Sequence, residues 1–158
     1  MKADHLIQRL GLKKLPGEGG YYKETYRSEE MAGEDRNLST AIYYLITSEA
    51  NSKMHRVNSD EIFHFYFGDP VQILLLYPTG ESRIVFMGDN LPSGQRTQLV
   101  VPKGTWQGAL VVESDQYGYA FMGTTMAPGF EFEDFELGAQ ESLLLRFPQH
   151  EALIRELT

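Results

Sequence analysis

Residues 54–68 read MHRVNSDEIFHFYFG, and this stretch decides the fold. An Asn-Ser-Asp turn signal lies at its centre, and a run rich in aromatic residues follows the turn. If the turn joins two paired strands, His55 and Glu61 point to one face of the sheet. Val57 and Phe63 would share that face. A His and a Glu that converge in an apolar interior suit either a divalent metal ion or proton transfer.

A second turn lies in residues 101–107, which read VPKGTWQ. The strand that follows this turn would carry Gln107 into the same interior as His55 and Glu61. Trp106 has the opposite parity, so we expect it to pack elsewhere or to form an interface.

Strand-like runs follow one another along most of the chain, separated by turns rich in Gly and Pro. The expected strands are residues 21–27, 38–47, 61–67, 71–77, 83–87, 98–101, 107–113 and 117–124. Many short strands with little helix between them are typical of a β-sandwich or barrel. In the third run, alternation puts Phe63, Phe65 and Phe67 on one face of the sheet. His64 falls on the opposite face, away from a pocket.

Only the two ends of the chain change period from strand to helix. Asp4 is placed to cap a short helix that stops at Gly11. Residues 141–147 and 149–157 read as two further short helices, with Pro148 at the start of the second. The apolar residues of the last helix would cover part of the barrel.

The length and composition of the chain limit the classes of protein to which it can belong. With 158 residues, the chain has the usual size of one domain, taken here as residues 1–158. Its 14 basic and 22 acidic side chains give a net charge of −8, which argues against binding to nucleic acid or to an anionic membrane. The longest apolar run is far shorter than the roughly 20 residues of a spanning helix, and no signal peptide is seen. These features predict a cytoplasmic protein.

The spacing of these residues resembles the two cupin motifs. The first motif is a His, any residue, a second His, three or four residues, a Glu, six residues and a Gly, and His55, Glu61 and Gly68 match it. The second motif is a Pro, any residue, a Gly, two residues and a His, and Pro102 and Gly104 match it. Two metal-binding histidines of the motifs are replaced, by Val57 in the first motif and by Gln107 in the second.

Other segments are similar to one cupin family, the domain of unknown function 985. The matching residues are Pro16, residues 19–25, Leu45, the residues around His55 and Glu61, and the stretch MAPGFEFEDF at 126–135. This resemblance implies a mainly β fold, the cupin or RmlC-like jelly-roll barrel (a double-stranded β-helix) with short N- and C-terminal helices. It also implies self-association, as a homodimer or a higher homo-oligomer.

The candidate site surrounds His55 and Glu61, which we expect to act as a catalytic pair; the alternative is a structural ion pair at the barrel rim. Further ligand-binding candidates are Gln107, Tyr22, Glu24, Tyr43 and Phe63. The choice of Tyr22 and Glu24 over their neighbours rests on the tyrosine, whose apolar ring and polar tip suit a pocket mouth. A divalent metal would be held only weakly by His55, Glu61 and Gln107, because Val cannot bind a metal and a Gln carbonyl is a weak ligand.

Three functions fit this sequence. The first is an enzyme that acts on a sugar or a sugar-nucleotide-like metabolite by acid–base chemistry, as an epimerase or isomerase does. The second is a non-catalytic cupin that binds or senses a small molecule after losing its metal site. The third is a structural oligomer with a vestigial pocket. Fold-level resemblance does not choose among them.

Overall fold

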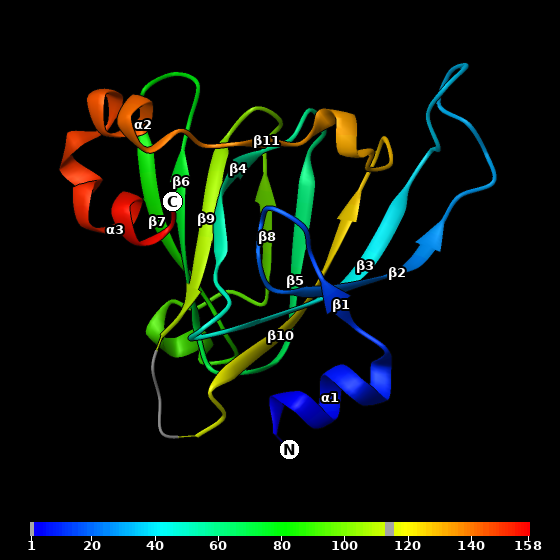
Figure 1. Ribbon diagram of the computed structural model, residues 1–158, viewed down its shortest axis with the longest axis horizontal. Coiled ribbons are helices and arrows are strands. Elements are labelled where there is room, and N and C mark those ends of the chain that lie inside the picture. Colours follow the sequence, from blue (N-terminus) through cyan, green and yellow to red (C-terminus); the bar gives the residue numbers. More distant parts are fainter. Residues whose placement is uncertain (1, 113–115) are drawn as a thin grey trace.

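Two antiparallel β-sheets pack face to face in the computed structural model, which describes residues 2–112 and 116–158 (Figure 1). The first sheet has the order β1 (Lys13–Lys14), β2 (Tyr21–Arg27), β3 (Thr40–Thr47), β10 (Tyr119–Met126), β5 (Glu61–Gly68) and β8 (Gln98–Val101). The second has the order β11 (Glu136–Leu137), β4 (Ser52–Arg56), β9 (Trp106–Val111), β6 (Val71–Leu76) and β7 (Ser82–Met87). The β-rich architecture predicted from the sequence is confirmed.

The core lies between the two sheets because alternate side chains of each strand point inward. It is built from apolar residues of both sheets, among them Tyr44, Phe63, Phe65, Ile73, Leu75 and Met122, all less than a tenth exposed. Strand β6 is buried on both faces, so its sequence is a nearly continuous apolar run rather than an alternating one.

The sequence suggested that the turn between His55 and Glu61 joins two paired strands. The structure shows that it does not. His55 lies on β4, which pairs with β9 and β11, whereas Glu61 begins β5, which pairs with β10 and β8. The turn therefore carries the chain from one sheet to the other. His55 and Glu61 both line the interior, but they do so from opposite layers rather than from one face.

A bulge in β5 overturns the placement of Phe67. Met122 pairs with Phe65 and Phe121 pairs with Phe67, so one residue of β5 is extra in this ladder. Beyond the bulge the alternation reverses. Phe67 is 40% exposed and contacts Phe121 on the outer face of the sheet, with ring centroids 5.3 Å apart.

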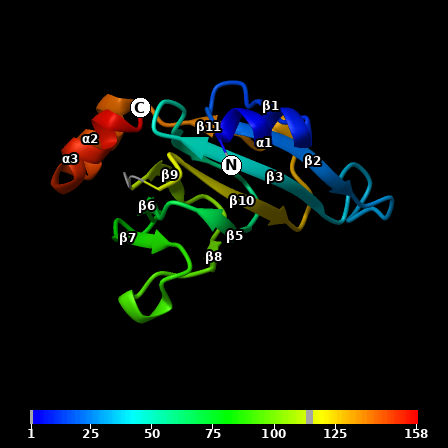
Figure 2. The same ribbon diagram turned by 90° about the horizontal axis from the view of Figure 1, so that it is seen from below.

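Helices cover part of the outer face of each sheet. Helix α1 (Ala3–Leu10) packs through Leu6 beside Leu45 and Tyr119 of the first sheet (Figure 2). It ends at Gly11 as predicted, with φ 66°, but its N-cap is Lys2, and Asp4 lies in the first turn. There its charge still complements the helix dipole.

The C-terminal helices α2 (Gln140–Arg146) and α3 (Glu151–Glu156) cover the second sheet. Phe147 and Ile154 from this region are fully buried against Met54 and Leu74. Short 3₁₀ turns, η1 (Leu91–Ser93), η2 (Phe132–Asp134) and η3 (Pro148–His150), complete the described elements. Among the described residues, no helix is long and apolar enough to cross a membrane.

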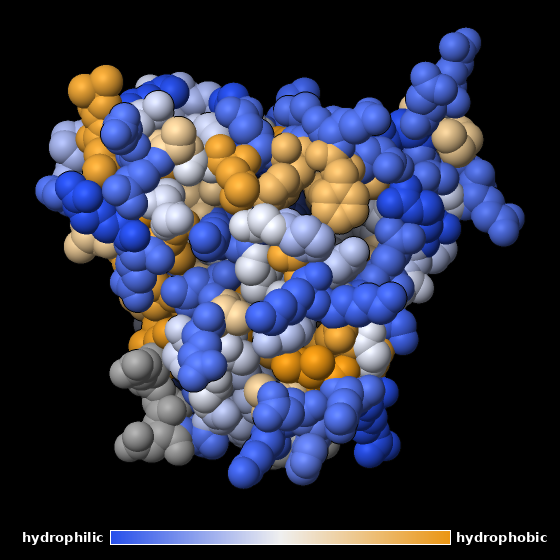
Figure 3. All heavy atoms as spheres, viewed as in Figure 1, coloured by the Kyte–Doolittle hydropathy of each residue, from blue (hydrophilic) through white to orange (hydrophobic). Residues whose placement is uncertain are grey.

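A strap, residues 127–138, runs from the end of β10 across one end of the barrel to α2 (Figure 1). It contains the PGFEFEDF sequence, and it lies beside the long hairpin 28–39 that joins β2 to β3. Figure 3 shows apolar and charged surface side by side along this end of the molecule. Phe132 and Leu137 of the strap are about half exposed.

Candidate functional site

A cavity of about 280 Å³ opens between the sheets beneath the strap. Strands β2, β3, β4, β5 and β10 all contribute side chains to it, as does the loop between β1 and β2. The polar residues of its wall that bear on the chemistry are Glu18, Glu24, Arg27, His55, Glu61 and Glu131.

His55 is held in one tautomer by its backbone partner. Its Nδ1 lies 2.7 Å from the carbonyl oxygen of Lys53, and the side chain is 2% exposed. Because a carbonyl can only accept, Nδ1 carries the hydrogen and donates it, which leaves the lone pair of the neutral imidazole on Nε2. Phe135 of the strap stacks on the ring at a centroid distance of 5.3 Å and fixes its plane.

Glu18 is the acidic partner of His55, and the sequence analysis did not find it. Its Oε2 lies 3.7 Å from His55 Nε2, and its Oε1 accepts a hydrogen bond of 2.9 Å from Ser52 Oγ. The backbone carbonyl of Glu18 also accepts from Lys53 N at 2.8 Å, which ties this loop to β4. The residue is only 8% exposed.

Two glycines allow the Glu18 loop to approach the barrel so closely. Gly19 and Gly20 have φ values of 99° and 70°, which side-chain-bearing residues rarely adopt. A Cβ on Gly19 would lie 2.3 Å from the carbonyl oxygen of Asn51. These residues hold a buried carboxylate against His55.

Glu61 is a carboxyl group in a dry environment. It is 7% exposed, and Gln107 Nε2 donates to its Oε2 at 2.7 Å. Burial raises the pKa of Glu61 above the ordinary value, and the negative charge of Glu18 adds to this shift, whereas a protonated His55 would oppose it. Burial also raises the pKa of Tyr44 well above its ordinary value, so this phenol stays neutral, and it donates to the carbonyl of Gly19 at 3.2 Å.

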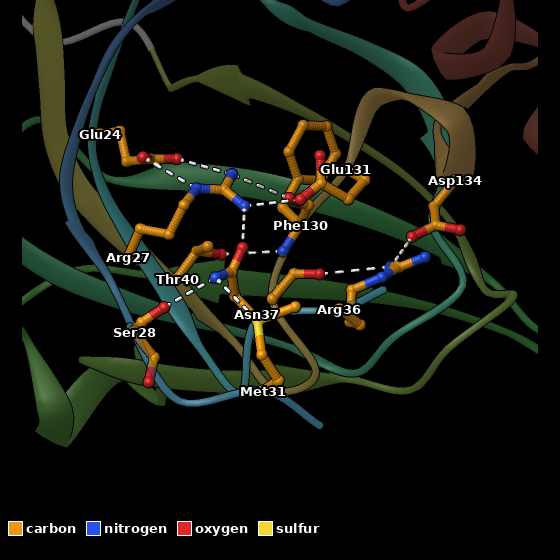
Figure 4. Close-up of polar contacts among 11 residues, drawn as sticks. Glu24, Arg27, Ser28, Met31, Arg36, Asn37, Thr40, Phe130, Glu131 and Asp134 are labelled. Carbon is orange, nitrogen blue, oxygen red and sulfur yellow. Dashed lines mark hydrogen bonds and ion pairs between the residues drawn. The ribbon is translucent and has the colours of Figure 1, made fainter. Parts of the chain in front are cut away.

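Arg27 sits at the mouth of the cavity with all five N–H groups in use (Figure 4). Its Nε and one terminal nitrogen donate to the two oxygens of Glu24, at 3.1 and 2.9 Å. The other terminal nitrogen donates to Glu131 and to Asn37, at 2.6 and 2.7 Å, and the carbonyl of Phe130 accepts the fifth bond. Arg36 likewise forms an ion pair with Asp134 of the strap. The two arginines therefore fasten the strap to β2 and to the 28–39 hairpin.

The predicted ligand-binding residues fall into four places. Tyr22 and Glu24 line the cavity. Gln107 lies behind Glu61 and reaches the site through it, and Phe63 belongs to the apolar core below. Tyr43 points to the outer face of the first sheet, where it packs on Tyr66 and Phe121.

The structure does not fit the metal that cupin motifs usually hold. Among residues 2–112 and 116–158, no three His, Cys, Asp or Glu side chains are grouped so that they could hold a metal ion. Val57 faces the cavity where a second histidine would stand. Gln107 directs its amide nitrogen at Glu61, and its Oε1 is buried without a hydrogen bond in the described structure.

Comparison with known proteins adds sequence relatives. The family profile described as Cupin superfamily (DUF985) matches residues 4–138. The uncharacterized protein YML079W of Saccharomyces cerevisiae is 30% identical in an alignment 132 residues long that covers 74% of this chain and 66% of that protein. The match thus spans just under two thirds of this relative.

Solved structures share the whole fold. Protein SO0799 from Shewanella oneidensis is 37% identical, with a TM-score of 0.91 over 100% of this chain and 98% of its own. A hypothetical protein from Leishmania major is 34% identical, with the same score over 100% and 99%. Oxalate decarboxylase from Bacillus subtilis has 14% identity and a TM-score of 0.58 over 92% of this chain and 36% of its own, which is a likeness of fold alone. The expected jelly-roll barrel is confirmed.

Proposed function

Since this chain belongs to the DUF985 family of the cupin superfamily, we propose that its barrel cavity carries out acid–base chemistry on a small hydroxylated metabolite. His55 is the general base and Glu61 is the general acid. The observation that carries this proposal is the hydrogen bond from His55 Nδ1 to the Lys53 carbonyl, which leaves a basic lone pair on Nε2 in a residue that lines the cavity.

Glu18 supports the base. When His55 takes a proton on Nε2, the imidazolium forms 3.7 Å from a carboxylate oxygen of Glu18, and both residues are buried. The carboxylate of Glu18 therefore lies where it can pair with the imidazolium that proton abstraction creates. The Lys53 carbonyl and the Phe135 ring keep the imidazole from turning away.

Glu61 is suited to the second proton transfer, from the protein to the substrate. Its raised pKa favours the protonated form, which is the form that can donate to a substrate oxygen. Gln107 orients the carboxyl group through its 2.7 Å bond. A base and an acid that reach one cavity from opposite sheets suit epimerisation or isomerisation next to a carbonyl, in which a proton leaves carbon and another reaches oxygen.

The size and charge of the cavity limit the classes of substrate that it can bind. Ligand pockets usually measure about 300–1,000 Å³, and this one, at about 280 Å³, falls just below that range. Arg27 has no hydrogen-bond donor left for a phosphate, because the protein accepts all five. These features favour a free sugar or a hydroxy-carbonyl compound over a sugar nucleotide.

Solvent hydrogen exchange tests the proposal. The protein is incubated in D₂O with a set of aldoses, ketoses and hydroxy acids, and deuterium at the carbon next to the carbonyl is measured by NMR. We expect exchange with at least one compound, and a decrease of about 10²–10⁴-fold in His55→Ala. His64→Ala is the matched control, because His64 bonds to Thr125 and does not line the cavity.

Two outcomes would count against catalysis. Compounds that raise the melting temperature of the wild-type protein without any exchange would assign the pocket to binding or sensing instead. Exchange that survives unchanged in His55→Ala would remove His55 from the role of base.

We also propose that the chain forms a homodimer through the outer face of its first sheet. In β3, β10, β5 and β8, which are fully described, the only Asp, Glu, Lys or Arg is Glu61, and it points into the cavity. The outer face of these strands instead carries Tyr66, Phe67 and Val100, each 40–52% exposed. A two-fold contact brings identical surfaces together, so a chain of net charge −8 associates best through a face without carboxylates.

A further inference from the structure

The charge at the mouth of the cavity points to one class of ligand. Four carboxylate side chains line the cavity: Glu18, Glu24, Glu61 and Glu131. The two cationic candidates are His55 and Arg27. Since Arg27 is saturated by protein acceptors, it neutralises part of the wall but offers no N–H group to a ligand.

Glu131 keeps a free acceptor at the mouth. Its Oε1 binds Arg27 at 2.6 Å, while its Oε2 has no hydrogen-bond partner among the described residues. The side chain is 39% exposed, so it is accessible to a ligand that enters the cavity. A carboxylate accepts several hydrogen bonds at once, and a bound ammonium group can use those that Arg27 leaves.

Aromatic rings flank this carboxylate on the strap. Phe130 and Phe132 pack edge to face, with centroids 5.1 Å apart and planes at 77°. Both line the cavity, and Phe132 is 54% exposed although it is a large apolar residue. Tyr22 adds a third ring to the wall. Aromatic faces combined with carboxylates are a common setting for an ammonium group, which the π electrons attract.

We infer that the cavity binds a hydroxylated amine, such as an amino sugar, with its ammonium group at the mouth beside Glu131, Phe130 and Phe132. The hydroxylated part of the ligand reaches inward to His55 and Glu61. The placement of the hydroxylated part rests on the proposed acid–base function, whereas the preference for an amine rests on the residues at the mouth alone.

Calorimetric titration at pH 7 with four matched hexoses tests the inference: D-glucosamine, D-glucose, N-acetyl-D-glucosamine and D-glucose 6-phosphate. We expect glucosamine to bind about tenfold more tightly than glucose, since one charge-assisted contact and one cation–π contact are gained. N-acetylation removes the charge and should abolish the advantage. The phosphate should bind most weakly, because it meets carboxylates without a free arginine.

Variants locate the effect. Glu131→Gln keeps an oxygen for Arg27 but loses the charge, and Phe132→Ala loses an exposed ring; each should bring glucosamine close to glucose. Glu156→Gln, on the exposed surface of α3, should keep the full preference.

Three results would overturn the inference: equal binding of glucosamine and glucose, tightest binding of the phosphate, or no binding of any hexose. Equal binding would leave the acid–base proposal intact, because deuterium exchange does not depend on an amine. Loss of exchange in His55→Ala together with an intact preference for glucosamine would support both.

Discussion

At the scale of single residues, Glu61 is placed where its ionised form is unfavourable. Its pKa is raised in the folded protein, chiefly by burial, so the folded state holds this proton more tightly than the unfolded chain. The stability that this gives is present in acid and is lost as the pH rises through the folded pKa. We therefore expect Glu61→Gln to increase the free energy of unfolding at neutral pH, while abolishing hydrogen exchange into substrate.

Urea unfolding of the wild-type protein and Glu61→Gln at several pH values measures this effect. The stabilising effect of the substitution should shrink as the pH falls below the ordinary glutamate value of 4.5, where both chains carry a neutral group. A substitution that destabilises the protein at pH 7 would show that the ionised carboxylate is the favoured form.

The replaced motif residues give a second prediction at this scale. Val57 faces the cavity, and Gln107 pairs in register with His55 and contacts Glu61. The double variant Val57→His with Gln107→His would therefore bring two imidazoles to the existing His and Glu. Imidazole and carboxylate ligands suit Mn²⁺ or Zn²⁺, so we expect stoichiometric metal after dialysis in the double variant, measured by elemental analysis.

Each single variant is the matched control, and it should retain less metal than the double variant. Stoichiometric metal in the wild-type protein would contradict the view that these two residues removed the site. A folded double variant without metal would mean that the surrounding wall, rather than the two side chains, prevents binding.

At the scale of elements, the strap depends on two arginines for its position. Arg27 and Arg36 bind Glu131, Asp134 and two strap carbonyls, and these contacts bridge segments about a hundred residues apart in sequence. A lysine at position 27 keeps the charge but cannot bond five acceptors. We expect Arg27→Lys to increase hydrogen–deuterium exchange in residues 127–138 and to weaken ligand binding, with little change in the core strands.

Arg155→Lys is the control for this experiment, because Arg155 pairs with Glu151 on the exposed surface of α3. Exposed pairs of this kind contribute about 0–1 kcal/mol and position nothing at the cavity. If Arg27→Lys exchanged no faster than the wild-type protein in the strap, the apolar contacts of Phe130 and Phe135 would be sufficient to hold it.

The sequence predicted most strands within two residues, because alternation and turn chemistry are local signals. It did not predict which strands pair. Nothing local shows that the turn before Glu61 changes sheets, or that a bulge in β5 turns Phe67 outward. Glu18 was missed for the same reason: its partners Ser52 and His55 are more than 30 residues away, and a glycine-rich turn carries no periodicity that assigns a side chain to a face.

At the scale of the whole molecule, the uncharged outer face of strands β3, β10, β5 and β8 is the feature that the cavity does not explain. Tyr66 lies over Gly123, where a Cβ would come within 2.3 Å of its hydroxyl, and it packs on Tyr43 and Phe121. Of these rings Tyr66 is 47% exposed and Phe121 is buried, while Phe67 and Val100 add exposed apolar surface on the same face. Such a patch is unusual on a monomer, and a second copy of the same face would cover it without bringing carboxylates together.

We expect light scattering to give twice the mass of the 18.0 kDa chain at micromolar concentration. A charge placed in the patch should separate the copies, because a two-fold contact would bury it opposite its own copy. Val100→Glu is therefore expected to yield a monomer, whereas Ile84→Glu, at an exposed position on β7 of the other sheet, should leave the dimer intact. A wild-type monomer, or a dimer that survives Val100→Glu and fails with Ile84→Glu, would move the contact to another face. Because the cavity is lined within one chain, the monomeric variant should still bind its ligand, which separates assembly from the chemistry of the site.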